Sequence, residues 1–192
     1  TYLLAAQNSS EIRASGGFPG SVGTIRIRDG ILSIGDFSSV YNVLSTHTPS
    51  AAGITDEEKE LFGSWMNAPR DACFDPAFER VAYIWALAYE QKNFEHVNGV
   101  VSLTPAIIQN MLGYIGNVTL SDGTELTGDN ATQVLQYDLY YKYLNANASS
   151  SAGDYVDNLF AETAKVTMAK LVSDFDVKKA GDYYLSLIHI SE

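Results

Sequence analysis

The stretch YLLAAQNSSEIRASGGF, residues 2–18, decides how this chain begins to fold. Residues 2–6 form an apolar run that is typical of a buried strand. A polar loop follows, with an amide, an acid, a base and a double glycine: Asn8, Glu11, Arg13, Gly16 and Gly17. A cation beside paired glycines is typical of backbone that approaches an anionic ligand closely. The stretch therefore predicts a buried strand followed by a candidate ligand-binding loop.

Each polar residue of this loop has a chemical role to which it is suited. Arg13 offers a planar fork of donors that fits phosphate or carboxylate, and the amides of Gly16 and Gly17 can face an anion. Asn8 and Glu11 would position Arg13 or bind a cation. The alternative is that Glu11 pairs with Arg13 and that the glycines serve only a turn.

A second group of charged residues, Arg70, Asp71 and Asp75, lies some sixty positions later. Two carboxylates beside an arginine can hold Mg²⁺ when substrate phosphates complete its coordination. The alternative is that Asp75 caps a helix and that Arg70 and Asp71 form a solvated pair. The two groups become one site only if the fold brings Arg13 and Asp71 together.

Composition limits both the fold and the class of partner. The chain has 192 residues, 46% of them hydrophobic, which suits one domain with a full core. Its net charge of -11 argues against a nucleic-acid partner and against a polybasic membrane patch. The single cysteine, Cys73, excludes an internal disulfide and is expected to be a small, partly buried hydrophobe.

The first half of the chain shows clear local signals. Alternating residues 24–28 and the turn at Asp29–Gly30 predict a β-hairpin that returns to residue 34. A short helix over 57–66 is expected to turn Leu61 and Trp65 inward. The pair Asp75–Pro76 then predicts the start of a helix. Its buried stripe is expected to comprise Phe78, Val81, Ala82, Trp85 and Tyr89.

The second half continues the alternation of strands and helices. The apolar run 97–103 predicts a central strand, and Thr104–Pro105 predicts the start of the next helix. A hairpin at 117–126, a helix from Thr127 to about 144 and an amphipathic helix over 156–173 follow. We therefore predict one α/β domain over residues 1–184, a sandwich with a mixed central sheet flanked by helices. Both ends are expected to be truncated, and residues 185–192 (LSLIHISE) resemble a translated sequencing adapter and are treated as a non-native tail.

Four tyrosines lie close together around Asp138: Tyr137, Tyr140, Tyr141 and Tyr143. So dense a group of rings can stack on sugars or line a groove. The alternative is that they belong to the core and its rim. The isolated histidines His47 and His96 lack the spacing of metal ligands, so zinc chemistry is not expected.

Several separated blocks resemble the bacterial family known as domain of unknown function 4012. They are residues 3–18, Arg70-Asp71-Ala72 with Asp75-Pro76, residues 97–101, and Gly116-Asn117-Val118 with residues 127–130. The resemblance implies a bacterial, often actinobacterial, protein of the cell envelope. It also implies a domain outside the cytoplasm, anchored by a membrane span upstream of the present sequence.

At the level of the fold, the chain is similar to the LytR–CpsA–Psr phosphotransferases, which transfer glycopolymers from pyrophosphate lipid carriers. One hypothesis that this implies is a phosphotransferase-like enzyme acting on a polyprenyl-pyrophosphate glycan, in which Arg13 and Arg70 clamp the pyrophosphate. Asp71, with Asp75 or Glu11, would hold Mg²⁺. The second hypothesis is a non-catalytic envelope domain that binds or scaffolds a glycan or a protein.

Overall fold

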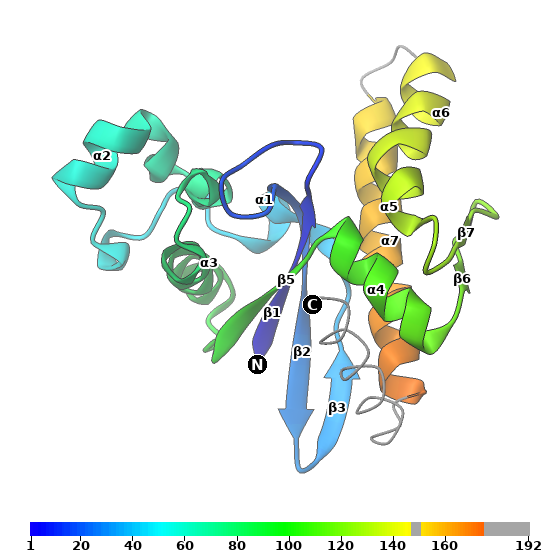
Figure 1. The fold of residues 1–192 in the computed structure, drawn as a ribbon. Helices are drawn as coiled ribbons and strands as arrows, with labels where there is room; N and C mark the ends of the chain where they lie inside the picture. The colour runs from blue at the N-terminus through cyan, green and yellow to red at the C-terminus, as the bar shows by residue number, and fades with distance from the viewer. Residues whose placement is uncertain (147–150, 175–192) are drawn as a thin grey trace, which may run out of the picture.

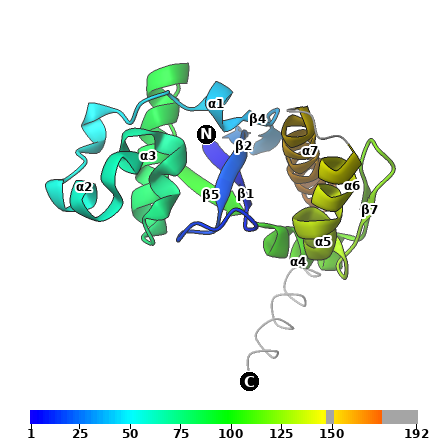
Figure 2. The same ribbon diagram turned by 90° about the horizontal axis from the view of Figure 1, so that it is seen from above.

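The computed structural model describes residues 1–146 and 151–174 and has a mixed sheet with helices on both faces (Figure 1). The sheet stands between a layer that contains α3 and a layer that contains α4 and α7 (Figure 2). This arrangement confirms the predicted α/β sandwich. The tail at 185–192 lies outside the described residues.

The sheet contains five strands, of which four follow one another from the start of the chain. They are β1 (Tyr2–Asn8), β2 (Phe18–Arg28), β3 (Ile31–Ile34), β4 (Ser38–Ser39) and β5 (Gly99–Leu103). The order is β3-β2-β1-β5, with β4 also paired to β2; β5 runs parallel to β1 and the other pairs are antiparallel. The predicted hairpin forms, with positive φ at Asp29 and Gly30. The prediction of a central strand over 97–103 is wrong in position, because β5 is an edge strand and β1 lies inside the sheet.

Strand β1 is buried on both faces and therefore links two parts of the core. Leu3 and Ala5 pack with the α3 layer, whereas Leu4 and Ala6 pack with the α7 layer. Successive side chains of a strand point to opposite faces, so a continuous apolar run is what a doubly covered strand requires. The apolar run at residues 2–6 was therefore the correct signal for this strand.

The first helical layer covers the face to which Leu3 and Ala5 point. It comprises α1 (Val40–Val43), η1 (Ser50–Ala52), α2 (Asp56–Phe62), η2 (Gly63–Asn67), η3 (Pro69–Phe74) and α3 (Phe78–Asn93). Helix α3 buries Val81, Trp85 and Tyr89 as its periodicity predicts, and the Trp85 indole N–H donates to the Pro69 carbonyl at 2.7 Å. This bond fixes η3 against α3.

Two predictions in this layer need correction. Helix α2 ends at Phe62, and Leu61 and Trp65 are 68% and 55% exposed rather than buried. Gly63 has a positive φ and the chain continues as the 3₁₀ turn η2, which carries Trp65 outward onto Phe74, with ring centroids 5.3 Å apart. The next helix starts at Phe78 instead of directly after Asp75, so Asp75 is not its N-cap residue.

The second helical layer packs on the opposite face of the sheet. It comprises α4 (Pro105–Ile115), β6 (Val118–Thr119), β7 (Glu125–Leu126), α5 (Ala131–Gln133), η4 (Val134–Asp138), α6 (Leu139–Ala146) and α7 (Ser151–Ser173). Thr104 caps α4 and β6 pairs with β7, as predicted. Helix α4 buries Ile108 and Leu112, whereas Ile107 is 40% exposed.

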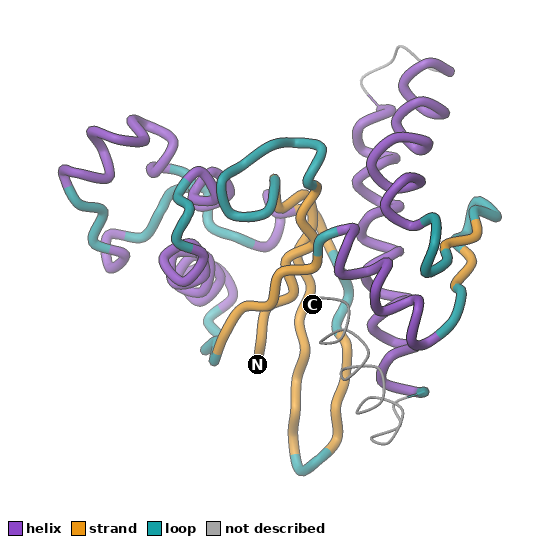
Figure 3. The backbone as a smooth tube through the Cα atoms, in the orientation of Figure 1, coloured by secondary structure: helices purple, strands orange, loops and turns teal. Residues whose placement is uncertain are grey.

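The helix predicted from Thr127 begins four residues later and changes its winding. The Thr127 hydroxyl accepts hydrogen bonds from the backbone of Asp129 and Asn130, and α5 starts at Ala131. The segment η4 is a π-helix that connects α5 to α6. Figure 3 shows the three segments as one continuous coil beside α7.

Candidate functional site

The loop over residues 9–17 lies above the ends of β1 and β2, where Figure 3 shows it in teal. Gln7, the last residue but one of β1, anchors it from below and is fully buried. Its Nε2 donates to the carbonyls of Ser15 and Gly17, both at 2.8 Å, and its Oε1 accepts from the Ser102 hydroxyl on β5. A buried amide with every hydrogen bond made holds a loop in one conformation.

The double glycine allows the loop to return closely over β1. Gly16 and Gly17 have φ values of 103° and 118°, which side chains rarely adopt. A Cβ atom at Gly17 would lie 2.2 Å from the Asn8 carbonyl oxygen. The first role of these glycines is therefore the tight return of the backbone, as in the alternative interpretation of the sequence.

Asn8 and Glu11 connect the start of the loop to the second helical layer. The Asn8 Oδ1 accepts from the Ser10 amide at 3.0 Å, and its Nδ2 donates to Glu11 Oε1 at 3.4 Å and to the Tyr140 hydroxyl. Burial, and next the negative charge of Glu11, raise the pKa of Tyr140 to about 12. Glu11 therefore interacts with Asn8, and the alternative pairing of Glu11 with Arg13 does not form among the described residues.

Arg13 lies at the other end of the loop, over aromatic rings. Its Cζ atom is 4.6 Å from the centroid of the Phe74 ring and 5.7 Å from that of Phe18. Within the described chain its guanidinium makes one hydrogen bond, from Nη1 to the neighbouring carbonyl of Ile12, and its Nε is buried without a partner. The rings hold the cation in place and leave most of its donors unused.

The 3₁₀ turn η3 supplies the second group of charged residues and is bonded to the loop. The Ser15 amide and hydroxyl both donate to the Cys73 carbonyl at 3.2 Å. Cys73 is fully buried, and burial raises the pKa of its thiol to about 12, so it is an inert part of the core. These bonds place Phe74 under Arg13 and bring Arg70 and Asp71 to the same end of the sheet.

Arg70 is held in a similar way to Arg13. Its Cζ lies 5.1 Å from the ring centroid of Tyr41, and its Nε lies 3.4 Å from Asp71 Oδ2, too far for a strong hydrogen bond. Arg70 also lines a cavity of about 120 Å³ with Tyr41 and its neighbours in the chain. This cavity is large enough for an inorganic anion and too small for a polyprenyl chain.

Asp71 is the acidic centre of the site, with its side chain 7% exposed. Burial raises the pKa of this carboxyl group, and the positive charges of Arg70 and Arg13 partly oppose that shift. Both arginines are therefore near enough to act on one carboxylate. The structure thus brings Arg13 near Arg70 and Asp71, which lie 57 and 58 positions later in the sequence.

Asp75 is directed at other partners. Its Oδ1 accepts from the Ala77 amide at 2.8 Å, and its charge acts on Arg80 of α3. The described residues contain no group of three or more histidine, cysteine, aspartate or glutamate side chains that could hold a metal ion. A site in which Asp71 and Asp75 hold Mg²⁺ together with substrate phosphates needs only two protein ligands and stays a prediction.

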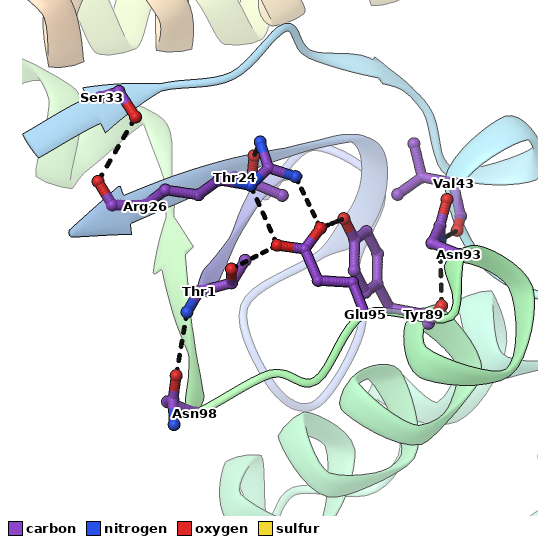
Figure 4. A network of polar contacts seen from close by, with 9 residues as sticks. All are labelled: Thr1, Thr24, Arg26, Ser33, Val43, Tyr89, Asn93, Glu95 and Asn98. Carbon is purple, nitrogen blue, oxygen red and sulfur yellow. Dashed lines mark hydrogen bonds and ion pairs between the residues drawn. The ribbon is translucent and has the colours of Figure 1, made fainter. Parts of the chain in front are cut away.

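Two other arginines show what a fully bonded guanidinium looks like in this fold. Arg26 makes two bonds to Glu95, Nε to Oε1 at 3.0 Å and Nη2 to Oε2 at 2.7 Å (Figure 4). Arg80 makes two bonds to Glu58, at 2.6 and 2.9 Å, and donates to the carbonyls of Ala52 and Gly53. Most guanidinium donors of Arg26 and Arg80 therefore have partners, whereas most of those of Arg13 and Arg70 do not among the described residues.

Sequence reasoning missed several residues that build this site. Gln7 and Phe74 support the loop and its arginine, but only Gln7 carried a usable signal. A polar side chain that ends an apolar, buried strand is an exception that calls for internal partners. Phe74 comes from a distant element and is recognisable only in three dimensions. Tyr140 was singled out with its neighbouring tyrosines, but its contact with Asn8 was not predicted.

Comparison with known proteins places the chain in a family. Within residues 1–146 and 151–174, none of the helices combines the length and the apolar character needed to cross a membrane. No curated protein and no solved structure is significantly similar to the chain. A family model described as Protein of unknown function (DUF4012) matches residues 1–140, well over half of the sequence. The resemblance of the sequence blocks is thereby confirmed, and the chain belongs to this family.

Proposed function

We propose that this domain binds the pyrophosphate group of a lipid-linked glycan outside the cytoplasm of a bacterium, through Arg13 and Arg70, and acts on it as a phosphotransferase-like protein. One observation supports this proposal above the others. Arg13 and Arg70 lie on aromatic rings beside one buried carboxylate and have most of their donors unused among the described residues. A guanidinium fork with unused donors is suited to phosphate oxygens.

The residues at hand suggest a division of roles. Arg13 and Arg70 would bind the two phosphoryl groups and stabilise the charge that develops on them. Asp71, whose pKa is raised by burial, is suited to accept the proton of an acceptor hydroxyl as its oxygen attacks phosphorus. The bond between that phosphorus and the bridging oxygen would then break, and the lipid phosphate would leave. Gln7, Asn8 and Glu11 would hold the loop that carries Arg13, and Gly16 and Gly17 would let it close.

Magnesium is part of the sequence-based hypothesis. In the present proposal it is only a condition of the binding test, which is carried out with and without Mg²⁺. When bound, Mg²⁺ would neutralise the charge of the pyrophosphate. A magnesium site shared by Asp71 and Asp75 stays a prediction, so we assign no chemical step to the metal. Glu11 is bonded to Asn8.

A non-catalytic envelope domain is the second candidate, and one observation favours it. The cavity that Arg70 lines has about 120 Å³ of space, which does not accommodate a lipid chain. A domain that binds only the exposed part of a glycan, or scaffolds a protein, needs no such space. Turnover of a lipid-linked glycan would exclude this candidate.

The test compares two arginine variants for binding of a polyprenyl pyrophosphate and of inorganic pyrophosphate, each with and without Mg²⁺. Arg13→Ala is expected to weaken both affinities at least about tenfold, because it removes charge-assisted hydrogen bonds. Arg28→Ala is the matched control, since Arg28 is exposed on the β2–β3 hairpin and its loss changes net charge equally. Equal binding by Arg13→Ala and the wild type would remove the proposed clamp.

A further inference from the structure

A pair of tyrosines lies next to the loop and has no part in the chemistry proposed above. Tyr137 and Tyr141 are one helical turn apart, with ring centroids separated by 6.0 Å and ring planes inclined by 14°. The residues are 58% and 63% exposed, unlike Tyr140 on the same helix, which is partly buried and contacts the loop. The two rings are nearly parallel and stacked, and both remain exposed, so the pair presents aromatic surface to solvent. We call this stacked pair the platform.

The platform is joined to the loop that carries Arg13. The Ser10 hydroxyl donates to the Gln136 carbonyl at 3.1 Å, directly before Tyr137 in the chain. The Asn8 side chain donates to the hydroxyl of Tyr140, the residue that directly precedes Tyr141 in the chain. These bonds fall within or next to the π-helix η4, a winding that is rare and frequent at functional sites. The loop that carries Arg13 is therefore in contact, through its first residues, with the helix that presents the platform.

We propose that Tyr137 and Tyr141 bind a pyranose ring of a glycan. The apolar face of a pyranose matches an aromatic ring in size and can lie flat on it. Polar groups at the edge of the platform suit the sugar hydroxyls, because Asp138 and Gln133 lie beside it and contact each other at 3.2 Å. This inference rests on the proposed function, because a sugar is expected at the platform only if the neighbouring loop binds a glycan-linked pyrophosphate.

The size and charge of the surface favour a sugar over a macromolecule. Two aromatic side chains offer at most about 400 Å² of contact, about half of what one partner contributes to a stable protein interface. The net charge of -11 disfavours a nucleic acid, whose bases would otherwise suit such rings. A single sugar ring is the ligand that this area matches.

The experiment measures binding of neutral tri- and tetrasaccharides from bacterial surface polymers, presented as an array, to the full chain. The double variant Tyr137→Ala/Tyr141→Ala is expected to lose at least about tenfold in affinity, because it removes the stacking surface. The variant Tyr137→Phe/Tyr141→Phe keeps the rings and is expected to bind within about threefold of the wild type. Tyr83→Ala is the matched control, since Tyr83 is 49% exposed on α3, far along the chain from the platform.

The outcomes separate this inference from the proposed function. Loss of binding in the alanine variant with retention in the phenylalanine variant supports the platform, whether or not the protein binds pyrophosphate. An array on which no oligosaccharide binds the wild type overturns it, and so does equal binding by the alanine variant, which would leave the rings as a protein contact. The alanine variant is expected to bind inorganic pyrophosphate as the wild type does, so a loss there would also contradict the assignment of separate roles.

Discussion

Arg80 and Arg13 differ in what their surroundings leave free. Arg80 has a two-point bond to Glu58 and donates to two carbonyls, so its role in the fold uses its hydrogen bonds fully. Arg13 rests on Phe74 and Phe18 and, among the described residues, makes one hydrogen bond, to the carbonyl of Ile12. An arginine whose guanidinium is held in place but keeps unused hydrogen-bond donors is better suited to bind a ligand than one whose donors are all engaged within the fold. Arg26 belongs with Arg80, and Arg70 with Arg13.

Acid should weaken the structural pairs most of all. The pKa of Glu58 and that of Glu95 are both lowered to about 2, by Arg80 and by Arg26. A carboxylate whose pKa is lowered in the folded state stabilises the protein at pH values above its unfolded-state pKa. This stabilisation is lost as the pH falls from about 4.5 toward 2. We expect protonation of each carboxylate to lower the unfolding free energy of the protein by on the order of 2–3 kcal/mol over this range. Urea titrations at several pH values check this, and a flat profile between pH 5 and 2.5 would contradict it.

Removing one structural arginine should have the next largest effect. Arg80→Ala leaves Glu58, whose side chain is 14% exposed, without its partner and is expected to cost about 3 kcal/mol of unfolding free energy. Arg13→Ala removes a cation over a ring and should cost about 1 kcal/mol. Arg28→Ala is the control, with a change within about 0.5 kcal/mol. Chemical denaturation at pH 7 measures all three, and equal costs for Arg80 and Arg13 would remove the contrast between them.

The return of the loop gives a smaller effect that is specific to the site. Gly17→Ala forces a Cβ against the Asn8 carbonyl oxygen and a positive φ on alanine, for an expected cost of about 2 kcal/mol. Gly30→Ala is matched in backbone strain but has open space around it, so about 1 kcal/mol is expected. Thermal unfolding of the two variants compares them. If Gly17→Ala were as stable as Gly30→Ala, the close contact between loop and β1 would be incorrect.

Neutralising Asp71 should have the smallest effect on the unfolding free energy, and its sign should be opposite to that of neutralising Glu58. Its raised pKa means that the charged carboxylate opposes folding at neutral pH, and the opposition disappears as the pH falls and the group is protonated. Asp71→Asn is therefore expected to leave stability at pH 7 unchanged or higher, within about 0.5 kcal/mol. Glu58→Gln, the matched amide variant, should destabilise at pH 7. A loss for Asp71→Asn as large as that for Glu58→Gln would make Asp71 a structural residue.

The sequence allowed the local features of this fold to be predicted, because their causes are local. The apolar run of β1, the turn at Asp29–Gly30 and the Thr104 cap each depend on a few adjacent residues. The edge position of β5 and the outward turn of Trp65 depend on distant packing. The predictions of a central strand and of a buried Trp65 were therefore wrong. For the site, the meeting of Arg13 with Asp71 followed only from the fold. The aromatic supports from Phe74 and Tyr41 left no pattern in the sequence.

The most direct test of the contrast observes the guanidinium groups themselves. In a titration of the wild-type protein with inorganic pyrophosphate, the side-chain Nε–H signals of its five arginines can be followed by NMR after assignment by substitution. The Arg13 and Arg70 signals are expected to shift in proportion to each other and to saturate, while those of Arg26 and Arg80 stay in place. Unmoved Arg13 and Arg70 signals at saturating pyrophosphate, or shifts of all arginines alike, would contradict the central claim.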